Sequence, residues 1–139
     1  MIDPLQASSR LTGAGLEAQS LRLRVVSENI ANAQSTGQTE GSDPYARKTI
    51  TFKTELDRAL GSASVRVKEI GVDTSPFQVQ YDPGNPAADP NGYVKMPNVN
   101  MLMEMADMRE ANRSYEANLQ MVKQARSMIS SMIDLLRGA

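Results

Sequence analysis

The chain of 139 residues contains no cysteine and no histidine. Their absence excludes disulfide bonds, thiolate nucleophiles, histidine general bases and the common zinc sites. Most hydrolase mechanisms are excluded with them.

The chain also lacks a strong charge imbalance and any long apolar run. It has 15 basic and 16 acidic side chains, so no basic surface for nucleic acid is expected. No stretch approaches 18 consecutive apolar residues, and the first six residues lack the regions of a signal peptide. We expect a soluble protein that is made in the cytoplasm and does not insert directly into a membrane.

Three loop aspartates are candidates for acid catalysis. Asp43, Asp82 and Asp89 lie in loops where two carboxylates could meet and act as in a glycosidase. Aspartates beside proline and glycine more often form turns. A small acid-dependent muramidase is therefore the weakest hypothesis.

Toward the C-terminus, apolar residues recur with heptad spacing. One series is Met101, Met108, Tyr115, Val122, Ile129 and Leu136, and the second is Met105, Asn112, Leu119, Arg126 and Ile133. This pattern predicts a long helix whose seam packs on another helix in coiled-coil fashion, with the methionines at 101, 103, 105 and 108 as core and seam residues. Asn112 and Arg126 interrupt the seam, either because it is open to solvent there or because polar partners set its register.

The ends of this helix are marked by capping residues. Asn98 and Asn100 after Pro97 are N-cap candidates, and Gly138 is a stop signal. At 1.5 Å per residue the helix is roughly 55 Å long. A sphere of this chain length would be only about 37 Å across. The molecule must therefore be elongated.

A second helix is predicted at the N-terminus, from about Pro4 or Leu16 to about Ala33. Asp3 before Pro4 is a good cap pair. Its apolar positions with heptad spacing are Leu16, Leu23, Val26, Ile30 and Ala33. Gly13 and Gly15 leave its start undecided, because each costs about 1 kcal/mol relative to alanine. The C-terminal helix is the longer of the two, so part of its seam is left for other chains.

The middle of the chain is rich in glycine and proline, which exclude a long helix there. Short alternating segments predict strands at residues 48–53, 64–70, 77–81 and 93–96. The predicted fold is mainly α, with a small β-rich central domain. We expect three segments, namely an N-terminal helix at 1–33, a central segment at 34–97 and a C-terminal helix at 98–139, the two helices forming one inner domain.

Several motifs carry a family resemblance. They are Ser27-Glu28-Asn29-Ile30-Ala31-Asn32, Pro44-Tyr45-Ala46-Arg47-Lys48, Tyr81-Asp82-Pro83-Gly84-Asn85-Pro86-Ala87, Asn91-Gly92-Tyr93-Val94, Pro97-Asn98-Val99-Asn100 with Glu104-Met105, and Ala111-Asn112-Arg113-Ser114-Tyr115-Glu116-Ala117-Asn118. Together they span nearly the whole chain. The sequence resembles the axial proteins of the bacterial flagellar rod and hook, in particular the proximal rod proteins. The loop at residues 34–42 departs from that pattern, so no loop contacts are carried over.

The resemblance implies a structural subunit of the basal-body rod, the hollow drive shaft that transmits torque and conducts exported subunits. Such a subunit is expected to have no enzymatic activity and to need no cofactor or metal ion. It implies partners among proximal and distal rod proteins, copies of the chain, membrane-ring and hook-basal-body proteins, and the flagellar type III export apparatus. It also implies export without a cleaved signal to a periplasmic rod. The expected assembly residues are Leu16, Leu23, Val26, Asn29, Ile30, Asn32, Met105, Met108, Tyr115, Leu119, Val122, Ile129, Ile133 and Leu136.

Two questions stay open at this point, one about the function of the chain and one about the role of two asparagines. The chain could be a cytoplasmic coiled-coil adaptor or export chaperone whose helices clamp another protein. Asn29 and Asn32 could hold the chain exit or a neighbouring subunit, or they could be helix-end residues that bond their own backbone.

Overall fold

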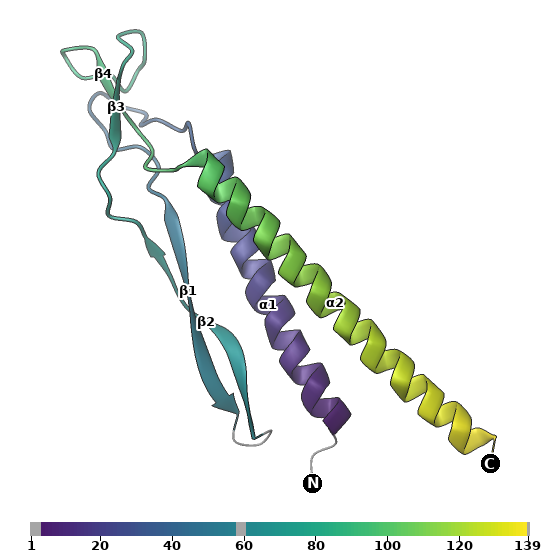
Figure 1. Cartoon of the computed structure of the whole chain (residues 1–139). Coiled ribbons are helices and arrows are strands. Elements are labelled where there is room, and N and C mark those ends of the chain that lie inside the picture. The colour runs from purple at the N-terminus through teal and green to yellow at the C-terminus, as the bar shows by residue number, and fades with distance from the viewer. Residues whose placement is uncertain (1–3, 58–60, 139) are drawn as a thin grey trace.

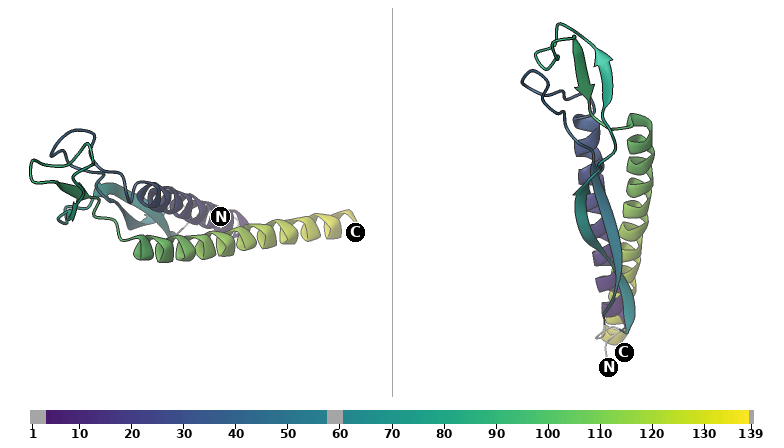
Figure 2. Two further views of the ribbon diagram at one scale, coloured as in Figure 1. Left: turned by 90° about the horizontal axis from the view of Figure 1, so that it is seen from above. Right: turned by 90° about the vertical axis from the view of Figure 1, so that its left-hand side faces the viewer.

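A computed structural model describes residues 4–57 and 61–138. In chain order it contains α1 (Pro4–Ala31), β1 (Lys48–Asp57), β2 (Ser62–Val72), β3 (Gln78–Tyr81), β4 (Tyr93–Met96) and α2 (Met101–Arg137). The two helices lie side by side and antiparallel, the β1–β2 hairpin runs along α1, and β3–β4 forms a tip at one end (Figure 1). Two further views show the elongated shape that the sequence predicts (Figure 2).

Helix α1 begins at Pro4, so the earlier of the two predicted starts is correct. Gly15 is tolerated in its interior because α2 approaches closely there. A Cβ atom on Gly15 would lie 2.9 Å from Nδ2 of Asn118. Helical hydrogen bonding continues one residue beyond the last turn, where the Asn32 N–H donates to the carbonyl of Glu28. The expected N-cap Asp3 lies outside the described residues.

Helix α2 has the predicted caps. The side chain of Asn100 accepts hydrogen bonds from the backbone N–H groups of Leu102 and Met103, and the N–H of Gly138 donates to the carbonyl of Asp134. The helix contains 37 residues, which corresponds to about 55 Å. No helix of the described residues is long and apolar enough to cross a membrane.

The register of the helix pair leaves the end of α2 uncovered. Asn29 contacts Glu104, and Gly15 lies against Asn118. Fourteen residues toward the start of α1 therefore correspond to fourteen residues toward the end of α2. On this register Pro4 lies opposite Ile129. Residues 130–137 therefore project beyond the first described residue of α1, as the yellow end of the ribbon shows in Figure 1.

The β1–β2 hairpin contains a bulge that keeps its apolar residues on one face. Thr51 pairs with Glu69 and Phe52 pairs with Val67, which leaves Lys68 as the extra residue. Side chains alternate between the faces of a strand. One extra residue therefore moves Ile70 to the same face as Val67. This face points toward α1, because Val65 and Val67 line a cavity together with Ala14, Ala18 and Leu21.

The two sheets are separate two-stranded hairpins rather than one continuous sheet. In the tip hairpin, Tyr81 pairs with Tyr93, and their rings meet edge to face with centroids 5.3 Å apart. Gly92 has a φ of +84°, and a Cβ atom there would lie 2.9 Å from the Tyr81 ring. A glycine is therefore required at this turn.

The apolar core of the subunit is small. Among the residues that the structure describes, its buried side chains include Ala18, Val25, Val26, Ala87, Val94 and Ala111. Two of the largest fully buried side chains are polar, namely Asn29 and Glu104. Met101, Met103 and Met105, expected as core and seam residues, are exposed and do not belong to the core of the single subunit. Their place in a seam with other chains stays a prediction. The helices and hairpins of the chain thus meet around a polar junction, and the helices contain 28 and 37 of the 139 residues.

Candidate functional site

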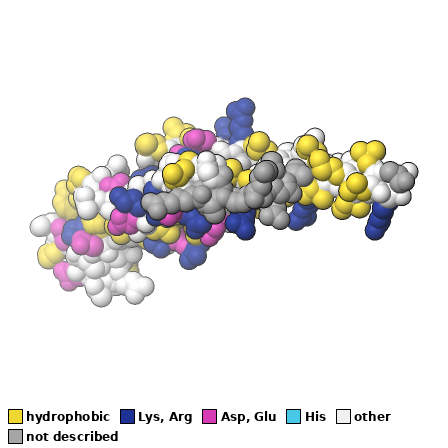
Figure 3. Space-filling model, turned by 90° about the horizontal axis from the view of Figure 1, so that it is seen from below, with side chains coloured by type: hydrophobic (Ala, Val, Ile, Leu, Met, Phe, Trp, Pro, Cys, Tyr) yellow, Lys and Arg dark blue, Asp and Glu magenta, His cyan; other side chains and the backbone are white. Residues whose placement is uncertain are grey.

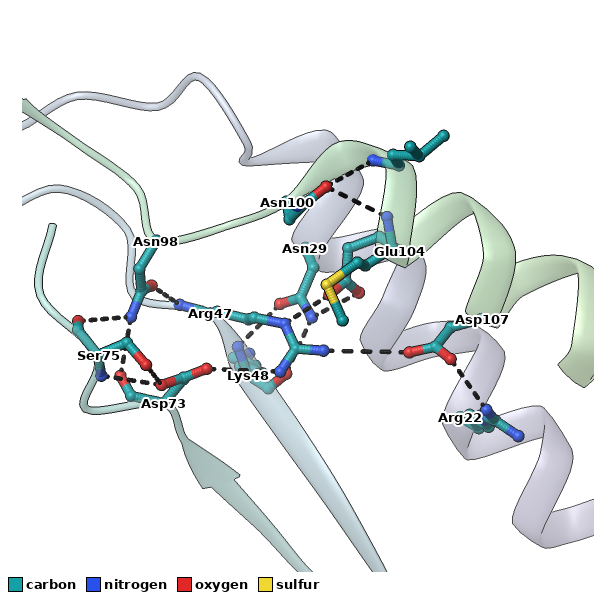
Figure 4. Close-up of polar contacts among 12 residues, drawn as sticks. Arg22, Asn29, Arg47, Lys48, Asp73, Ser75, Asn98, Asn100, Glu104 and Asp107 are labelled. Atoms are coloured by element: carbon teal, nitrogen blue, oxygen red, sulfur yellow. Dashed lines mark hydrogen bonds and ion pairs between the residues drawn. The ribbon is translucent and has the colours of Figure 1, made fainter. Parts of the chain in front are cut away.

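The polar junction lies where α1 ends, the hairpin begins and ends, and α2 begins (Figure 4). Asn29 is at its centre and is only 1% exposed. Its Oδ1 accepts hydrogen bonds from the Lys48 N–H and the Tyr45 hydroxyl, both at 2.8 Å. Its Nδ2 donates to the Lys48 carbonyl at 2.9 Å and to Oε2 of Glu104 at 3.0 Å. All four hydrogen-bonding positions of the amide are therefore used.

Asn29 thereby binds the first residue of β1 in the way a neighbouring strand would. It takes both the N–H and the carbonyl of Lys48, which are groups that a strand partner normally satisfies. The structure thus decides between the two alternatives for this residue, since Asn29 holds the chain after its exit from α1.

Asn32 has a local role instead. Its Nδ2 donates to the Glu28 carbonyl at 2.8 Å, and its Oδ1 accepts a hydrogen bond from the Ser35 hydroxyl. Both partners lie within four residues in the sequence. Asn32 is therefore a helix-end residue that bonds its own backbone and the following turn.

Glu104 is a buried carboxylate in the first turn of α2, with no exposed surface. Arg47 neutralises it through an Nε–Oε1 contact of 2.5 Å. The same guanidinium lies 3.5 Å from Asp73 and 4.0 Å from Asp107. Burial alone would lower the pKa of Arg47, but the hydrogen bond to Glu104 and the attraction of the three carboxylates raise it overall. Arg47 is therefore held as a cation that joins the residues just before β1 and just after β2 to α2.

Asn98 links the hairpin base to the segment before α2. Its Oδ1 accepts a hydrogen bond from the Arg47 N–H at 2.7 Å, and its Nδ2 donates to the carbonyls of Asp73 and Ser75. Asn98 is therefore a cross-link between segments, and Asn100 alone is the cap. Heptad spacing did not select Arg47, Asn98 or Glu104 as site residues. The one acidic residue within the apolar run of residues 101–105 is the signal that could have indicated a buried charge.

A second salt bridge joins the helices further along. Arg22 of α1 lies 3.1 Å from Asp107 and 3.3 Å from Glu110, both on α2. Arg22 is largely covered, whereas both acids are more exposed. Such a partly exposed pair contributes little stability, about 0 to 1 kcal/mol. It is a second polar contact between the two helices.

The side of α2 that faces α1 differs from the predicted seam by about one residue. The buried or half-buried positions of α2 are Glu104, Asp107, Met108, Ala111, Ser114, Tyr115, Asn118, Leu119, Val122 and Ala125. Met105, Asn112, Arg126 and Ile133 of the second predicted series are exposed. Asn112 and Arg126 therefore lie in the solvent-open part of the seam within this subunit. Coiled-coil packing along the predicted seam stays a prediction.

The expected assembly residues fall into three groups. Val26 and Asn29 are buried by the subunit itself. Half-buried residues are Leu16, Leu23, Ile30, Asn32, Met108, Tyr115, Leu119 and Val122. Met105, Ile129, Ile133 and Leu136 are exposed, Leu136 at 81%. Figure 3 shows apolar side chains at the surface toward the C-terminal end of the molecule.

The loop aspartates act as structural residues. Oδ1 of Asp89 accepts hydrogen bonds from the N–H groups of Asn91 and Tyr93, as expected for a turn former. Asp43 pairs with Lys95 at 2.7 Å. Among the residues that the structure describes, no three acidic side chains are placed to hold a metal ion.

Comparison with known proteins gives full-length matches. A flagellar basal-body rod protein FlgC from Agrobacterium fabrum is 64% identical over 138 residues, covering 99% of each chain. The protein of the same name from Borreliella burgdorferi is 39% identical, covering 96% of this chain and 99% of the relative. That of Salmonella typhimurium is 38% identical, covering 90% of this chain and 92% of the relative.

Residues 91–135 also match the family model for the C-terminal region of the flagellar basal body rod FlgEFG proteins. This region includes most of α2 and the segment that contributes Asn98 and Glu104 to the junction. The chain therefore belongs to the FlgC family of flagellar basal-body rod proteins, which are structural components and not enzymes.

Proposed function

We propose that the chain is a structural subunit of the basal-body rod and that it joins its neighbours through the surface of α2 that α1 leaves uncovered. The full-length similarity to rod proteins supports the assignment. The observation that supports the surface is the exposure of Ile129, Met132, Ile133 and Leu136 on a helix whose end lies beyond α1. A contiguous exposed apolar surface of this kind is typical of a protein–protein contact.

The finer features of this role are part of the same proposal. The paired helices form the inner domain of a hollow helical rod, and the central segment lies outside them. Neighbours are copies of the chain, proximal and distal rod proteins, membrane-ring and hook-basal-body proteins. The subunit reaches a periplasmic rod through the flagellar type III export apparatus, without a cleaved signal peptide.

A charge in the uncovered surface tests the proposal. Ile133 is 45% exposed and lies beyond the α1 contact, so Ile133→Asp should leave the subunit fold intact. Burial of the same charge between subunits would cost several kcal/mol. We expect cells with this variant to export the protein but to lose motility, and purified basal bodies to lack it. Ser130→Asp, an exposed polar position on the same helix end, is the matched control and should support swimming.

The outcome that contradicts the proposal is equally clear. If Ile133→Asp cells swim normally and the variant is recovered in basal bodies at the parental level, this surface is not an assembly contact. Retention of the parental protein in the cytoplasm of flagellated cells would instead favour an adaptor or chaperone.

A further inference from the structure

The contact between α1 and α2 repeats along its length. On α2 the small or polar contact positions Glu104, Ala111, Asn118 and Ala125 are seven residues apart, and so are Met108, Tyr115 and Val122. A repeating surface is compatible with more than one register. A slip of one heptad corresponds to a shift of about 10.5 Å along the helix.

Packing of the apolar side chains does not forbid such a slip. In the slipped register Ala125 would replace Asn118 beside Gly15, and alanine is smaller than the asparagine, whose Nδ2 now lies 2.9 Å from where a Cβ atom on Gly15 would be. The slip would also bring Ile129 and Met132 under α1, which would cover apolar surface that is now exposed. Apolar burial by itself therefore does not hold the helices in the observed register.

A slip would break the polar contacts between the helices. The weaker of these are the partly exposed pairs of Arg22 with Asp107 and Glu110, and the stronger are the buried contacts of the polar junction. Ala111 would replace Glu104 opposite Asn29, and a methyl group cannot accept the Nδ2 hydrogen bond that Glu104 Oε2 now accepts at 3.0 Å. Glu104 would also move away from Arg47, with which it now forms a 2.5 Å contact. Buried groups that lose such partners carry a large penalty.

We propose that Asn29, Arg47 and Glu104 together set the register of α2 against α1. They are positioning residues, since they select one register for two helix surfaces whose repeating contacts are compatible with more than one. Buried polar groups in helical seams are known to specify register at some cost in stability. The register in turn sets how far residues 130–137 extend beyond α1. It is a property of the single chain and does not depend on the place of that chain in the rod.

The absence of native cysteine allows a direct test by cross-linking. On the observed register Leu11 lies opposite Val122, whereas a one-heptad slip places it opposite Ile129. Purified full-length chains would carry Leu11→Cys with either Val122→Cys or Ile129→Cys, and a short bis-maleimide would join them. Only cross-linked monomers, separated from dimers by gel mobility, are counted.

We expect the 11–122 product to dominate in the parental chain. In the variant Asn29→Leu, Arg47→Met, Glu104→Leu, the ratio of 11–122 to 11–129 product should fall at least about tenfold, while circular dichroism shows retained helix. Glu104→Gln alone keeps an acceptor for Asn29 and should keep the parental ratio. Asp43→Leu, Lys95→Leu removes an exposed ion pair and is the matched control.

Three outcomes would overturn the inference. The first is that the triple variant keeps its full helical signal and gives the same ratio of 11–122 to 11–129 product as the parental chain. The second is loss of helix in the triple variant, which would make the cluster a source of stability and not of register. The third is a parental chain that gives both products equally or no 11–122 product.

Discussion

Replacing Asn29 by leucine removes the amide that joins α1 to the hairpin and to α2. Leucine has a similar size, so the change deletes hydrogen bonds more than volume. It leaves the Lys48 N–H and carbonyl, the Tyr45 hydroxyl and Glu104 Oε2 each without one partner. Glu104 is wholly buried, whereas Lys48 and Tyr45 are half-buried and regain some bonding from water.

The expected loss follows from these exposures. A buried polar group without a partner costs about 1–3 kcal/mol. With Glu104 at the upper end and the other groups at the lower end, Asn29→Leu should lower the free energy of unfolding by about 3–6 kcal/mol. Asn32→Leu is the matched control, because it removes a local bond to the Glu28 carbonyl and should cost only about 1 kcal/mol.

Urea denaturation of the purified chain, followed by the helical circular dichroism signal, measures both losses. Basal-body yield and swimming should follow the same order, with Asn29→Leu much more defective than Asn32→Leu. Equal urea midpoints for the two variants would refute the role assigned to Asn29. Asn29→Asp keeps the shape but places a second carboxylate 3.0 Å from Glu104, so it should be at least as damaging as leucine.

Two further predictions concern the glycines of α1 and the ion pair between Glu28 and Lys48. A Cβ atom on Gly13 would meet nothing within 4 Å, so Gly13→Ala should stabilise the chain by about 0.5–1 kcal/mol, measured by thermal unfolding. Gly15→Ala should stabilise the chain less or destabilise it, because the new Cβ atom would lie 2.9 Å from Nδ2 of Asn118. Adding Asn118→Ala to Gly15→Ala should restore the stability. Hydrogen bonds from Lys48 and Arg24 lower the pKa of Glu28 from its ordinary value of 4.5. The ionised carboxylate therefore contributes to the stability of the fold in full above pH 4.5, and this stability is lost as the pH falls through the lowered pKa. The hydrogen bond to Glu28 raises the pKa of Lys48 above 10.5. The stability that the Lys48 ammonium contributes is therefore lost only as the pH rises beyond that value. Glu28→Gln should flatten both limbs of the unfolding midpoint against pH, and unchanged limbs would contradict this assignment.

Local signals in the sequence determined the elements of this fold. The caps Asn100 and Gly138 and the heptad spacing fixed α2, because capping and helix periodicity depend on neighbours within one or two turns. Alternation located all four strands, although β1 and β2 extend several residues beyond the predicted segments. Family motifs spread along the chain identified the protein class.

Tertiary structure decided which side of each element is covered. The heptad pattern marked the apolar side of α2, yet α1 covers a side turned toward Glu104, Ala111 and Asn118. Small residues allow the close approach at Gly15, and Glu104 meets partners that come from residues 29 and 47. Burial of a charge depends on groups distant in sequence, and periodicity within one helix carries no information about them. The sequence therefore determined the helices and strands, and only their packing created the polar junction.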